Sequence, residues 1–438
     1  MSLFEYLRGL AFWFFDLVKG GKVKKALELL EEIEGKNISD DEAEKVQKVY
    51  LDKLLHHCIS NVEAYKGQTS TYLQEWPVVN KLILKDNACH LAANMTNGRL
   101  FEMATSGSTG IPFIIKQDVV KKRHVNAEVI FYNKPYGYSI GKSIVYFRSV
   151  IRSIKKSKLQ ELMQNIHYLD CSDLSDEGIR NMLINLKHFS KSGSVILSYA
   201  STLETLRRYC SKKNITSLAD CNIKGVVSQS EILYDATRAG IGSLFDCKCV
   251  SRYSNEENGI LAQDDYAPQK FLYNRANYIV EILKMDCDEA ADVGELGRIV
   301  VTDLFNYAMP MVRYDTGDIA KWEKVEIDGK IRKAITGLSG RKVDMIYDTD
   351  GNTVSPHAIT NTLWNFPEIL QFQFIQKGAN IYVMKVNTKD NRLEREKDLM
   401  CQLKSYLGDN ARIDINYCDD IPILASGKRR YIVNEFSR

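Results

Sequence analysis

The sequence lacks several patterns that would assign it to a common class of protein. Its ten cysteines are scattered, and no CxxC pair or Cys/His array has the spacing of zinc ligands. Lys and Arg total 59 against 56 Asp and Glu, a surplus too small to indicate nucleic-acid binding. No cleavable signal segment is recognised either, so we expect reduced thiols in a cytoplasmic protein.

The first eighteen residues are crowded with apolar side chains, yet this segment is too short to span a bilayer. Glu5, Arg8 and Asp16 interrupt it. Two interpretations stay open: a helix packed against its own protein or a subunit, and a helix lying at the inner face of a membrane. Four basic residues that would suit anionic lipid follow it: Lys19, Lys22, Lys24 and Lys25.

The length and composition of the chain predict a globular protein with more than one domain. It has 438 residues, of which 45% are hydrophobic and 26% charged. Chains beyond roughly 250 to 300 residues tend to split into domains. Apolar residues recur at helical spacing over 22–62, where Asp40 and Asp41 are suited to cap the second run. Residues 1–65 are therefore predicted to form a helical section.

The middle of the chain, residues 142–254, alternates between short β-rich runs and helical runs. The predicted strands are 143–147, 195–199, 225–228 and 249–253, and the predicted helices are 175–190, 202–213 and 231–242. This alternation predicts a parallel sheet with helices on both faces. Because such sheets bind ligands beyond the carboxyl ends of their strands, residues 228–231 and 253–259 are candidates for a site.

The last third of the chain is predicted to be β-rich and to end in a small α+β unit. Asp-Gly turns are expected at 328–329 and 350–351. The predicted elements are strands 299–304, 372–375 and 381–386, a helix carrying Leu393 to Leu407, and 413–417 as the last strand. The predicted fold class is thus α/β. A large domain, 1–342, has helix-covered, largely parallel sheets plus a smaller β-rich part, and a small α+β domain, 343–438, follows.

The sharpest local signal is the hexapeptide Thr105-Ser106-Gly107-Ser108-Thr109-Gly110, which lies between strand-like residues 100–104 and 112–116. Small hydroxylated residues and glycines expose backbone N–H groups at close range, which suits a polyphosphate. The hexapeptide differs from the P-loop of common NTPases, which requires Gly-Lys-Ser/Thr leading into a helix. By itself, it is equally compatible with an exposed loop.

Four further segments carry chemically suggestive side chains. Tyr253–Gly259 offers an aromatic ring followed by carboxylates, which suits base stacking and Mg²⁺. Met309–Asp318 ends in a carboxylate that could accept from both ribose hydroxyls. Gly340–Asp344 lies at the predicted domain junction, and Ala425–Arg430 puts a lysine on a turn near the end of the chain.

In this order the five segments resemble those of the adenylate-forming superfamily, which includes acyl-CoA synthetases, luciferase and adenylation domains of nonribosomal peptide synthesis. Ser230-Glu231 and the ending Ser426–Arg430 resemble the phenylacetate-CoA ligase branch, especially its capsular-polysaccharide-biosynthesis relatives. Each motif is weak by itself. Their shared order from residue 105 to 428 makes the resemblance specific.

The resemblance implies a role for each motif. Thr105 to Gly110 match the phosphate loop, and Tyr253 matches the tyrosine that stacks on adenine. Glu257 matches the glutamate associated with Mg²⁺, and Glu231 matches a glutamate whose neighbourhood touches adenine. The remaining matches are two ribose-binding residues and the lysine that contacts the acyl and phosphate oxygens: Asp318, Arg341 and Lys428.

The sequence departs from the family's pattern at three places. Many relatives have a lysine in or just after the phosphate loop, where Ile111 and Phe113 stand here. Glu256 stands where Thr or Ser usually precedes the metal-associated glutamate, so either the two acids share the metal or Glu256 is its partner. Val343 occupies the hinge about which the family rotates its small domain, where relatives often have Asp or Lys.

The resemblance also implies the reaction and its cofactors. A carboxylic acid is activated with ATP and Mg²⁺ as acyl-AMP, pyrophosphate leaves, and the acyl group passes to coenzyme A. Transfer to an amine of a sugar or amino acid, and a nucleotide-binding pseudoenzyme, are the alternatives. An acyl pocket is expected near 146–148, 199–201 and 227–230, where Arg148 favours a small or polar acid. No nucleic-acid partner is expected, and the resemblance suggests a homodimer.

Overall fold

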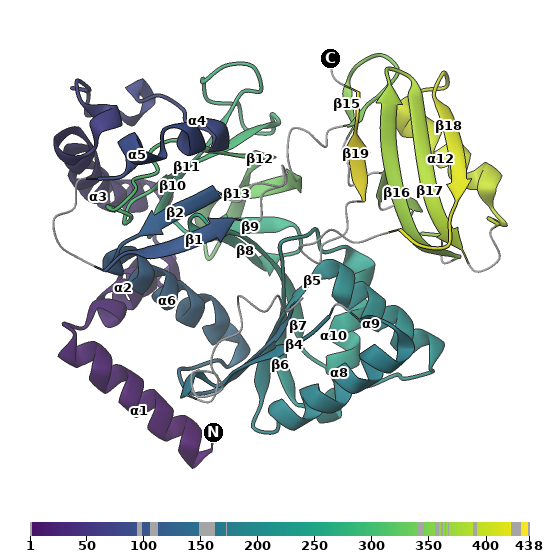
Figure 1. The fold of residues 1–438 in the computed structure, drawn as a ribbon, viewed down its shortest axis with the longest axis horizontal. Helices are drawn as coiled ribbons and strands as arrows, with labels where there is room; N and C mark the ends of the chain where they lie inside the picture. The colour runs from purple at the N-terminus through teal and green to yellow at the C-terminus, as the bar shows by residue number, and fades with distance from the viewer. Residues whose placement is uncertain are drawn as a thin grey trace. The chain divides into compact units, whose positions relative to one another are not determined.

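The computed structural model describes residues 2–93, 99–105, 113–148, 163–171, 173–339, 346–354, 359–360, 362–363, 365–366, 368–388, 392–421 and 431–436. Two compact units form: Met1–Thr316 with Ala320–Leu338, and Ser339–Arg438 with Gly317–Ile319. The predicted fold class is confirmed, because a large mixed α/β unit precedes a smaller α+β unit (Figure 1). The predicted boundary at 342–343 lies outside the described residues.

The N-terminal section is helical, as predicted. It contains α1 (Leu3–Val18), α2 (Lys22–Leu30), a π-helical turn (Glu31–Gly35) and α3 (Asp40–Asn61). The prediction that Asp40 and Asp41 cap α3 is wrong. Ser39 is the N-cap, and it forms a reciprocal capping box with Glu42, because a serine hydroxyl accepts the N–H three residues on while the glutamate accepts the serine N–H.

The larger unit is built on an eleven-stranded sheet in the order β10-β11-β12-β13-β9-β8-β7-β6-β5-β3-β4. Its parallel half consists of β3 (Ser143–Phe147), β4 (Ile166–Leu169), β5 (Ser194–Tyr199), β6 (Ile223–Gln229) and β7 (Lys248–Asn255). The four strands predicted from the sequence are thus confirmed. The edge strand β4 was not predicted, because its four residues are mostly half-buried and carry no apolar run.

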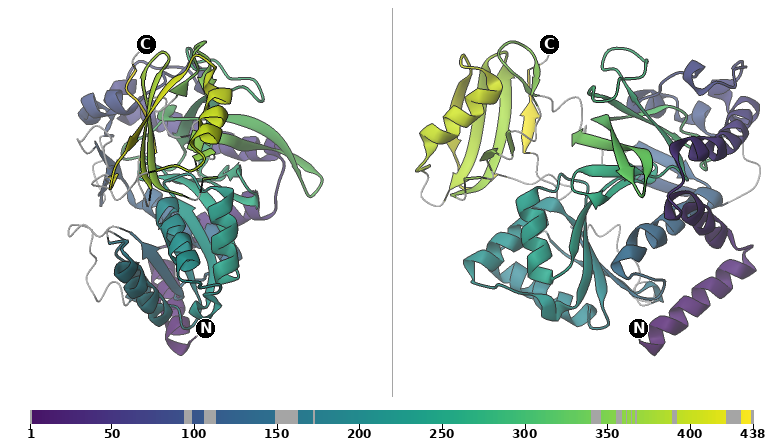
Figure 2. Two further views of the ribbon diagram at one scale, coloured as in Figure 1. Left: turned by 90° about the vertical axis from the view of Figure 1, so that its right-hand side faces the viewer. Right: turned by 180° about the vertical axis from the view of Figure 1, so that it is seen from behind.

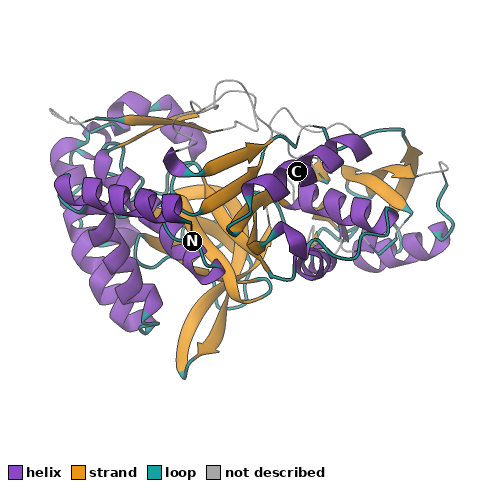
Figure 3. Ribbon diagram, turned by 90° about the horizontal axis from the view of Figure 1, so that it is seen from below, coloured by secondary structure: helices purple, strands orange, loops and turns teal. Residues whose placement is uncertain are grey.

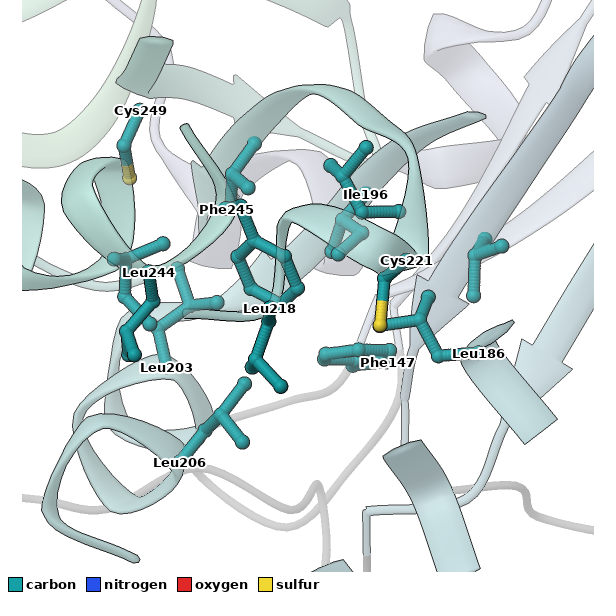
Figure 4. Packing of buried hydrophobic residues seen from close by; sticks show 14 of the residues in the cluster. Phe147, Leu186, Ile196, Leu203, Leu206, Leu218, Cys221, Leu244, Phe245 and Cys249 are labelled. Carbon is teal, nitrogen blue, oxygen red and sulfur yellow. The ribbon is translucent and has the colours of Figure 1, made fainter. Parts of the chain in front are cut away.

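Alternate residues of the parallel strands face two different helix layers, because successive side chains of a strand point to opposite faces. Val145, Ile196 and Val226 pack against α8 (Asp176–Phe189), α9 (Ala200–Lys212) and α10 (Asp235–Phe245), as Figure 4 shows for part of this core. Their neighbours Ile144 and Val195 pack instead against α2 and α6 (Val119–Asn133). The predicted helices on both faces are therefore confirmed, and Figure 2 shows both layers.

In the other half of the large sheet, every strand pair whose register is defined is antiparallel. It contains β8 (Gly259–Ala267), β9 (Lys270–Tyr273), β10 (Tyr278–Leu283), β11 (Gly297–Asp303), β12 (Tyr314–Ile327) and β13 (Lys330–Ser339). Asp328 and Gly329 both have positive φ, which confirms the predicted Asp-Gly turn between β12 and β13. A separate antiparallel pair, β1 (Phe101–Thr105) and β2 (Phe113–Gln117), flanks the hexapeptide as predicted.

The smaller unit packs α12 (Glu396–Leu407) on a four-stranded sheet in the order β18-β17-β16-β19. The strands are β16 (Ile369–Gly378), β17 (Ile381–Thr388), β18 (Arg412–Tyr417) and β19 (Ile432–Asn434), and a β14–β15 pair (Ile346–Tyr347, Thr353–Val354) encloses the second Asp-Gly turn. Figure 3 colours these elements by type. The prediction that 413–417 is the last strand is wrong, because β19 pairs in parallel with β16.

A buried histidine lies beside the sheet. The ring of His124 on α6 stacks on Phe305, with 3.6 Å between the ring centroids. Its Nδ1 donates to Asn277 Oδ1 over 2.9 Å. Burial is the main reason that the pKa of His124 falls from 6.5 to about 4. The folded protein therefore keeps this ring neutral at pH values where the unfolded chain takes up a proton.

Stability should therefore fall as the pH drops from about 6.5 toward 4, by at most about 1.4 kcal/mol per pH unit from this group. We expect the free energy of unfolding of His124→Gln to depend less on pH in that window than that of the wild type. Urea unfolding at several pH values measures the difference. The exposed His56 offers the control His56→Gln, and equal slopes in all three proteins would contradict the prediction.

Candidate active site

The candidate site lies at one edge of the large sheet. Four parallel strands, β3, β5, β6 and β7, end there at Phe147, Tyr199, Gln229 and Asn255. Because the strands are parallel, the residues that follow them meet at the same edge. These residues include Arg148, Glu231, Glu256 and Glu257, so the predicted segments 228–231 and 253–259 are brought to the same edge of one sheet.

Glu257 is a buried carboxylate in the turn between β7 and β8. The hydroxyl of Tyr314 donates to its Oε1 over 3.4 Å, and Lys81 Nζ lies 3.8 Å from the same oxygen. Burial raises the pKa of Glu257, while Lys81 and Tyr314 oppose the rise. The turn thus holds an acidic group out of bulk water next to one cation and one hydroxyl.

Glu256, the neighbouring acid, has different surroundings. Its side chain is 48% exposed, and its Oε1 lies 3.7 Å from a guanidinium nitrogen of Arg148. Tyr199 feels the charges of both Arg148 and Glu256, so these three groups share one region. The two consecutive acids therefore reach different partners, and Glu257 is the more buried of the two.

Tyr253 is buried within β7, four residues before Glu257. Its hydroxyl donates to Thr316 Oγ1 over 3.3 Å, and Thr316 in turn donates to the carbonyl of Ile299. This contact brings the predicted adenine-stacking residue to the start of β12. Asp318 is half-buried in the same strand, in the segment Gly317–Ile319 that groups with the smaller unit. Its role as a ribose-binding residue stays a prediction.

Glu231 has a partner in the helix that follows β5. Its Oε2 accepts a hydrogen bond of 2.7 Å from the backbone N–H of Ser201 in the first turn of α9. The N-cap residue of that helix, Tyr199, supplies no side-chain acceptor, so the glutamate takes that place. The preceding residue, Ser230, has a φ of +67°, which turns the chain sharply after β6.

The other predicted site residues are only partly described. Thr105 ends β1 and pairs with Phe113 across the antiparallel pair. Ser106, Gly107, Ser108, Thr109 and Gly110 lie outside the described residues, as do Arg341, Val343 and Lys428.

Sequence reasoning missed Lys81 and Tyr314, the two side chains beside Glu257. Tyr314 lies within the segment 309–318 that was singled out, so its neighbourhood carried a signal. Lys81 is the first residue of the short helix α4 (Lys81–Asp86), 176 positions from the acid it faces, and no local pattern marks it. Long-range packing alone brings this cation to the site.

A buried polar network also supports the turn that carries Glu257. Glu128 Oε2 accepts the backbone N–H of Ile260 over 2.9 Å, and its Oε1 accepts from Asn277 and from the hydroxyl of Tyr278, each over 2.7 Å. Gly259 has a φ of +128°, and a Cβ there would overlap with Glu128 Oε2. The carboxylate thus fixes the backbone two to three residues beyond Glu257.

A lysine completes this network from α6. Lys121 Nζ donates to the Tyr278 hydroxyl over 2.9 Å and lies 2.7 Å from Asp303 Oδ2, and both ion-pair side chains are 0% exposed. Burial raises the pKa of Glu128, whereas Lys121 opposes the rise. One buried cation therefore lies close to two buried acids, one of which holds the backbone that follows the turn.

The fold places the chain in a known structural class: it has the fold of adenylate-forming ligases. It is similar to 2-hydroxyisobutyryl-CoA ligase in complex with 2-HIB-AMP, with a TM-score of 0.72 and 13% identity over 91% of this chain and 90% of that chain. It is also similar to the amide bond synthetase McbA from Marinactinospora thermotolerans, with a TM-score of 0.54 and 15% identity over 73% and 66% of the two chains.

Sequence comparison points to a particular relative. Residues 346–435 match the model of the CapK C-terminal domain. Over 389 residues, covering 84% of this chain and 82% of the other, the sequence is 22% identical to Protein CapK of Staphylococcus aureus. The predicted resemblance to the adenylate-forming superfamily and its capsular relatives is thereby confirmed. The solved structures share the fold with this chain.

Proposed function

We propose that this chain is an adenylate-forming ligase, which activates a carboxylic acid with ATP as acyl-AMP and releases pyrophosphate. The supporting observation is the buried Glu257 between Lys81 and Tyr314, at the carboxyl ends of parallel strands in a chain with this fold. Residues 1–342 would form the nucleotide-binding domain, and residues 343–438 a small domain that carries Lys428.

The reaction requires several anions to meet in one place. A carboxylate oxygen attacks the α-phosphorus of ATP, and the bond to pyrophosphate breaks as the mixed anhydride forms. Such a step depends on positioning and on charge neutralisation more than on proton transfer. In this chain, Lys81 lies near Glu257 and Arg148 near Glu256. We propose that Lys81 supplies the positive charge that a lysine in the phosphate loop supplies in many relatives.

The residues present are compatible with Mg²⁺ bound together with ATP. Within the described ranges, no three His, Cys, Asp or Glu side chains gather as a protein-only metal cage. Mg²⁺ is commonly held by one or two carboxylates plus substrate phosphates, so Glu257 suffices as the protein ligand. When bound, the ion would neutralise phosphate charge.

The other roles follow the motifs. We propose that Tyr253 packs on adenine, that Asp318 and Arg341 bind the ribose, and that Lys428 contacts the acyl and phosphate oxygens. Thr105 to Gly110 would cradle the phosphates. We also propose that the region around Glu231, whose carboxylate lies at the first turn of α9, contacts the adenine.

We further propose a small or polar acid as the substrate. The region beyond β3 and β5 contains Arg148 and Glu256 as well as the aromatic rings of Tyr146 and Tyr199. A long aliphatic chain would take water away from these partly exposed polar groups without offering them hydrogen bonds, which costs free energy.

The acyl acceptor is proposed to be coenzyme A, in keeping with the phenylacetate-CoA ligase resemblance. An amine of a sugar or amino acid is the second candidate, favoured by the fold shared with an amide bond synthetase and by the match to CapK. Mass spectrometry of the products distinguishes them, because a thioester appears with coenzyme A and an amide appears only with the amine.

ATP–pyrophosphate exchange with Mg²⁺ across aryl, short aliphatic, hydroxy and amino acids tests adenylation. Lys428→Ala is expected to lose the exchange while still binding ATP in calorimetry. Lys397→Ala is the matched control, since Lys397 is an exposed lysine on α12 of the same unit. Full exchange in Lys428→Ala would remove that lysine from the mechanism. ATP binding without exchange for any acid would favour the pseudoenzyme.

A further inference from the structure

Helix α1 presents its apolar face to solvent. Its two acids, Glu5 and Asp16, are the residues buried against the protein. Nine large apolar or aromatic side chains on it are between 49% and 73% exposed: Leu3, Phe4, Tyr6, Leu7, Leu10, Phe14, Phe15, Leu17 and Val18. A surface helix normally turns its apolar stripe toward the core, so this orientation is reversed. We call these nine residues the outer face of α1.

Polar contacts fix α1 in this orientation. Glu5 accepts a hydrogen bond from the hydroxyl of Ser192. The two carboxylate oxygens of Asp16 accept from the backbone N–H groups of Val23 and Lys24, both over 3.0 Å, and so cap the start of α2. Rotation of α1 about its axis to bury the outer face would break all of these bonds.

Close backbone approach points the same way. A Cβ on Gly9 would lie 2.9 Å from the carbonyl oxygen of Ile140, and a Cβ on Gly141 would overlap with the backbone of Glu5. On the same side, Phe12 and Trp13 pack at the margin of the core that α2 and α6 form. The inner side of α1 is therefore fitted to its own protein, and the outer face is left for another surface.

The charges around the outer face indicate what that surface is. Both acids of α1 are turned inward, whereas four exposed basic residues lie at its carboxyl end and at the start of α2. They are Lys19, Lys22, Lys24 and Lys25. Lys24 shares its charge with Glu28 over 3.9 Å, but both side chains are well exposed, so that pair screens it weakly. An apolar face with lysines at one end complements anionic lipid.

We propose that α1 lies in the headgroup region of an anionic phospholipid bilayer, with its outer face toward the acyl chains and the four lysines among the phosphates. The helix is 16 residues long, about 24 Å, and lies in the plane rather than across it. In the described part of the chain, no helix combines the length and apolarity needed to cross a bilayer. This inference is independent of the proposed ligase activity.

Vesicle flotation of the full chain tests the proposal. The protein should float with phosphatidylcholine vesicles containing phosphatidylglycerol, and less with phosphatidylcholine alone or at high salt. Leu7→Asp/Phe14→Asp should reduce the bound fraction roughly tenfold or more, because it puts two charges into the outer face. Ile184→Asp is the matched control, since Ile184 is an exposed apolar residue on α8, and it should bind as the wild type does.

A second pair of variants separates the two contributions. Lys22→Glu/Lys25→Glu leaves the outer face intact and should weaken flotation on anionic vesicles while leaving any binding to neutral vesicles unchanged. Thermal melting checks that every variant is folded. Equal flotation of Leu7→Asp/Phe14→Asp and wild type would overturn the proposal. A second result would also overturn it: the wild type does not float and is a dimer in analytical ultracentrifugation, and Leu7→Asp/Phe14→Asp is a monomer. A second copy would then cover the outer face.

Discussion

Glu257→Gln is expected to slow ATP–pyrophosphate exchange by roughly 10²–10³-fold. The substitution keeps the shape of the side chain but removes the negative charge that Lys81 faces across 3.8 Å. If this carboxylate associates with Mg²⁺ and ATP, its loss slows the chemical step, in which charge is redistributed, more than it weakens ATP binding. Exchange rates under saturating acid, with ATP affinity measured separately by calorimetry, give the size of the effect.

The stability of Glu257→Gln should not fall, which separates a chemical role from a structural one. Burial raises the pKa of Glu257, so the ionised group is held in the folded state at a cost. A neutral amide relieves that cost. Glu256→Gln is the control, because its side chain is half-exposed and faces Arg148 instead. If Glu256→Gln lost the exchange and Glu257→Gln kept it, the metal-associated acid would be Glu256.

Lys121→Met is expected to lower the free energy of unfolding by roughly 3–5 kcal/mol. The lysine is fully buried, and its removal leaves Asp303 without its ion-pair partner and Tyr278 without a donor. Glu128 would also lose the nearby positive charge that opposes its raised pKa. Urea unfolding at neutral pH measures the change through the midpoint at constant m.

Two comparisons make that result specific to the buried pair. Lys134→Met breaks an ion pair of the same 2.7 Å length with Glu31, but its partners are exposed and the cost should stay below about 1 kcal/mol. The double variant Lys121→Met/Asp303→Asn should cost less than the sum of its single variants, since the second change removes the stranded charge. Equal losses in Lys121→Met and Lys134→Met would contradict the role given to the network.

The elements that the sequence predicted share a strong local pattern. Strands β5 and β6 are runs of apolar residues between turn signals, and they were placed within two residues of their ends. The elements that were not predicted include the longer α6, β8 and β10. They also include two short strands, β4 with four residues and β19 with three. Their pairing depends on neighbours far away in the chain, which no local period records.

The candidate site divides along the same line. Glu256 and Glu257 were found because they lie in one recognisable segment after β7. Lys81 and Lys121 were not predicted, because their ion pairs join residues more than 150 positions apart in the sequence. The orientation of α1 was equally hidden. Its composition gave an apolar helix, but the choice of inner side depends on Ser192 and Ile140.

The position of Glu231 has a consequence for substrate selection. The amino end of a helix, with its unpaired N–H groups and partial positive charge, is a natural seat for an anion. At α9 the protein's own carboxylate already occupies that seat through Ser201. An incoming acid would meet like charge there, and the nearby cation that can receive it is Arg148. The proposed acid substrate would therefore be repelled from the start of α9, and it would compete with Glu256 for Arg148.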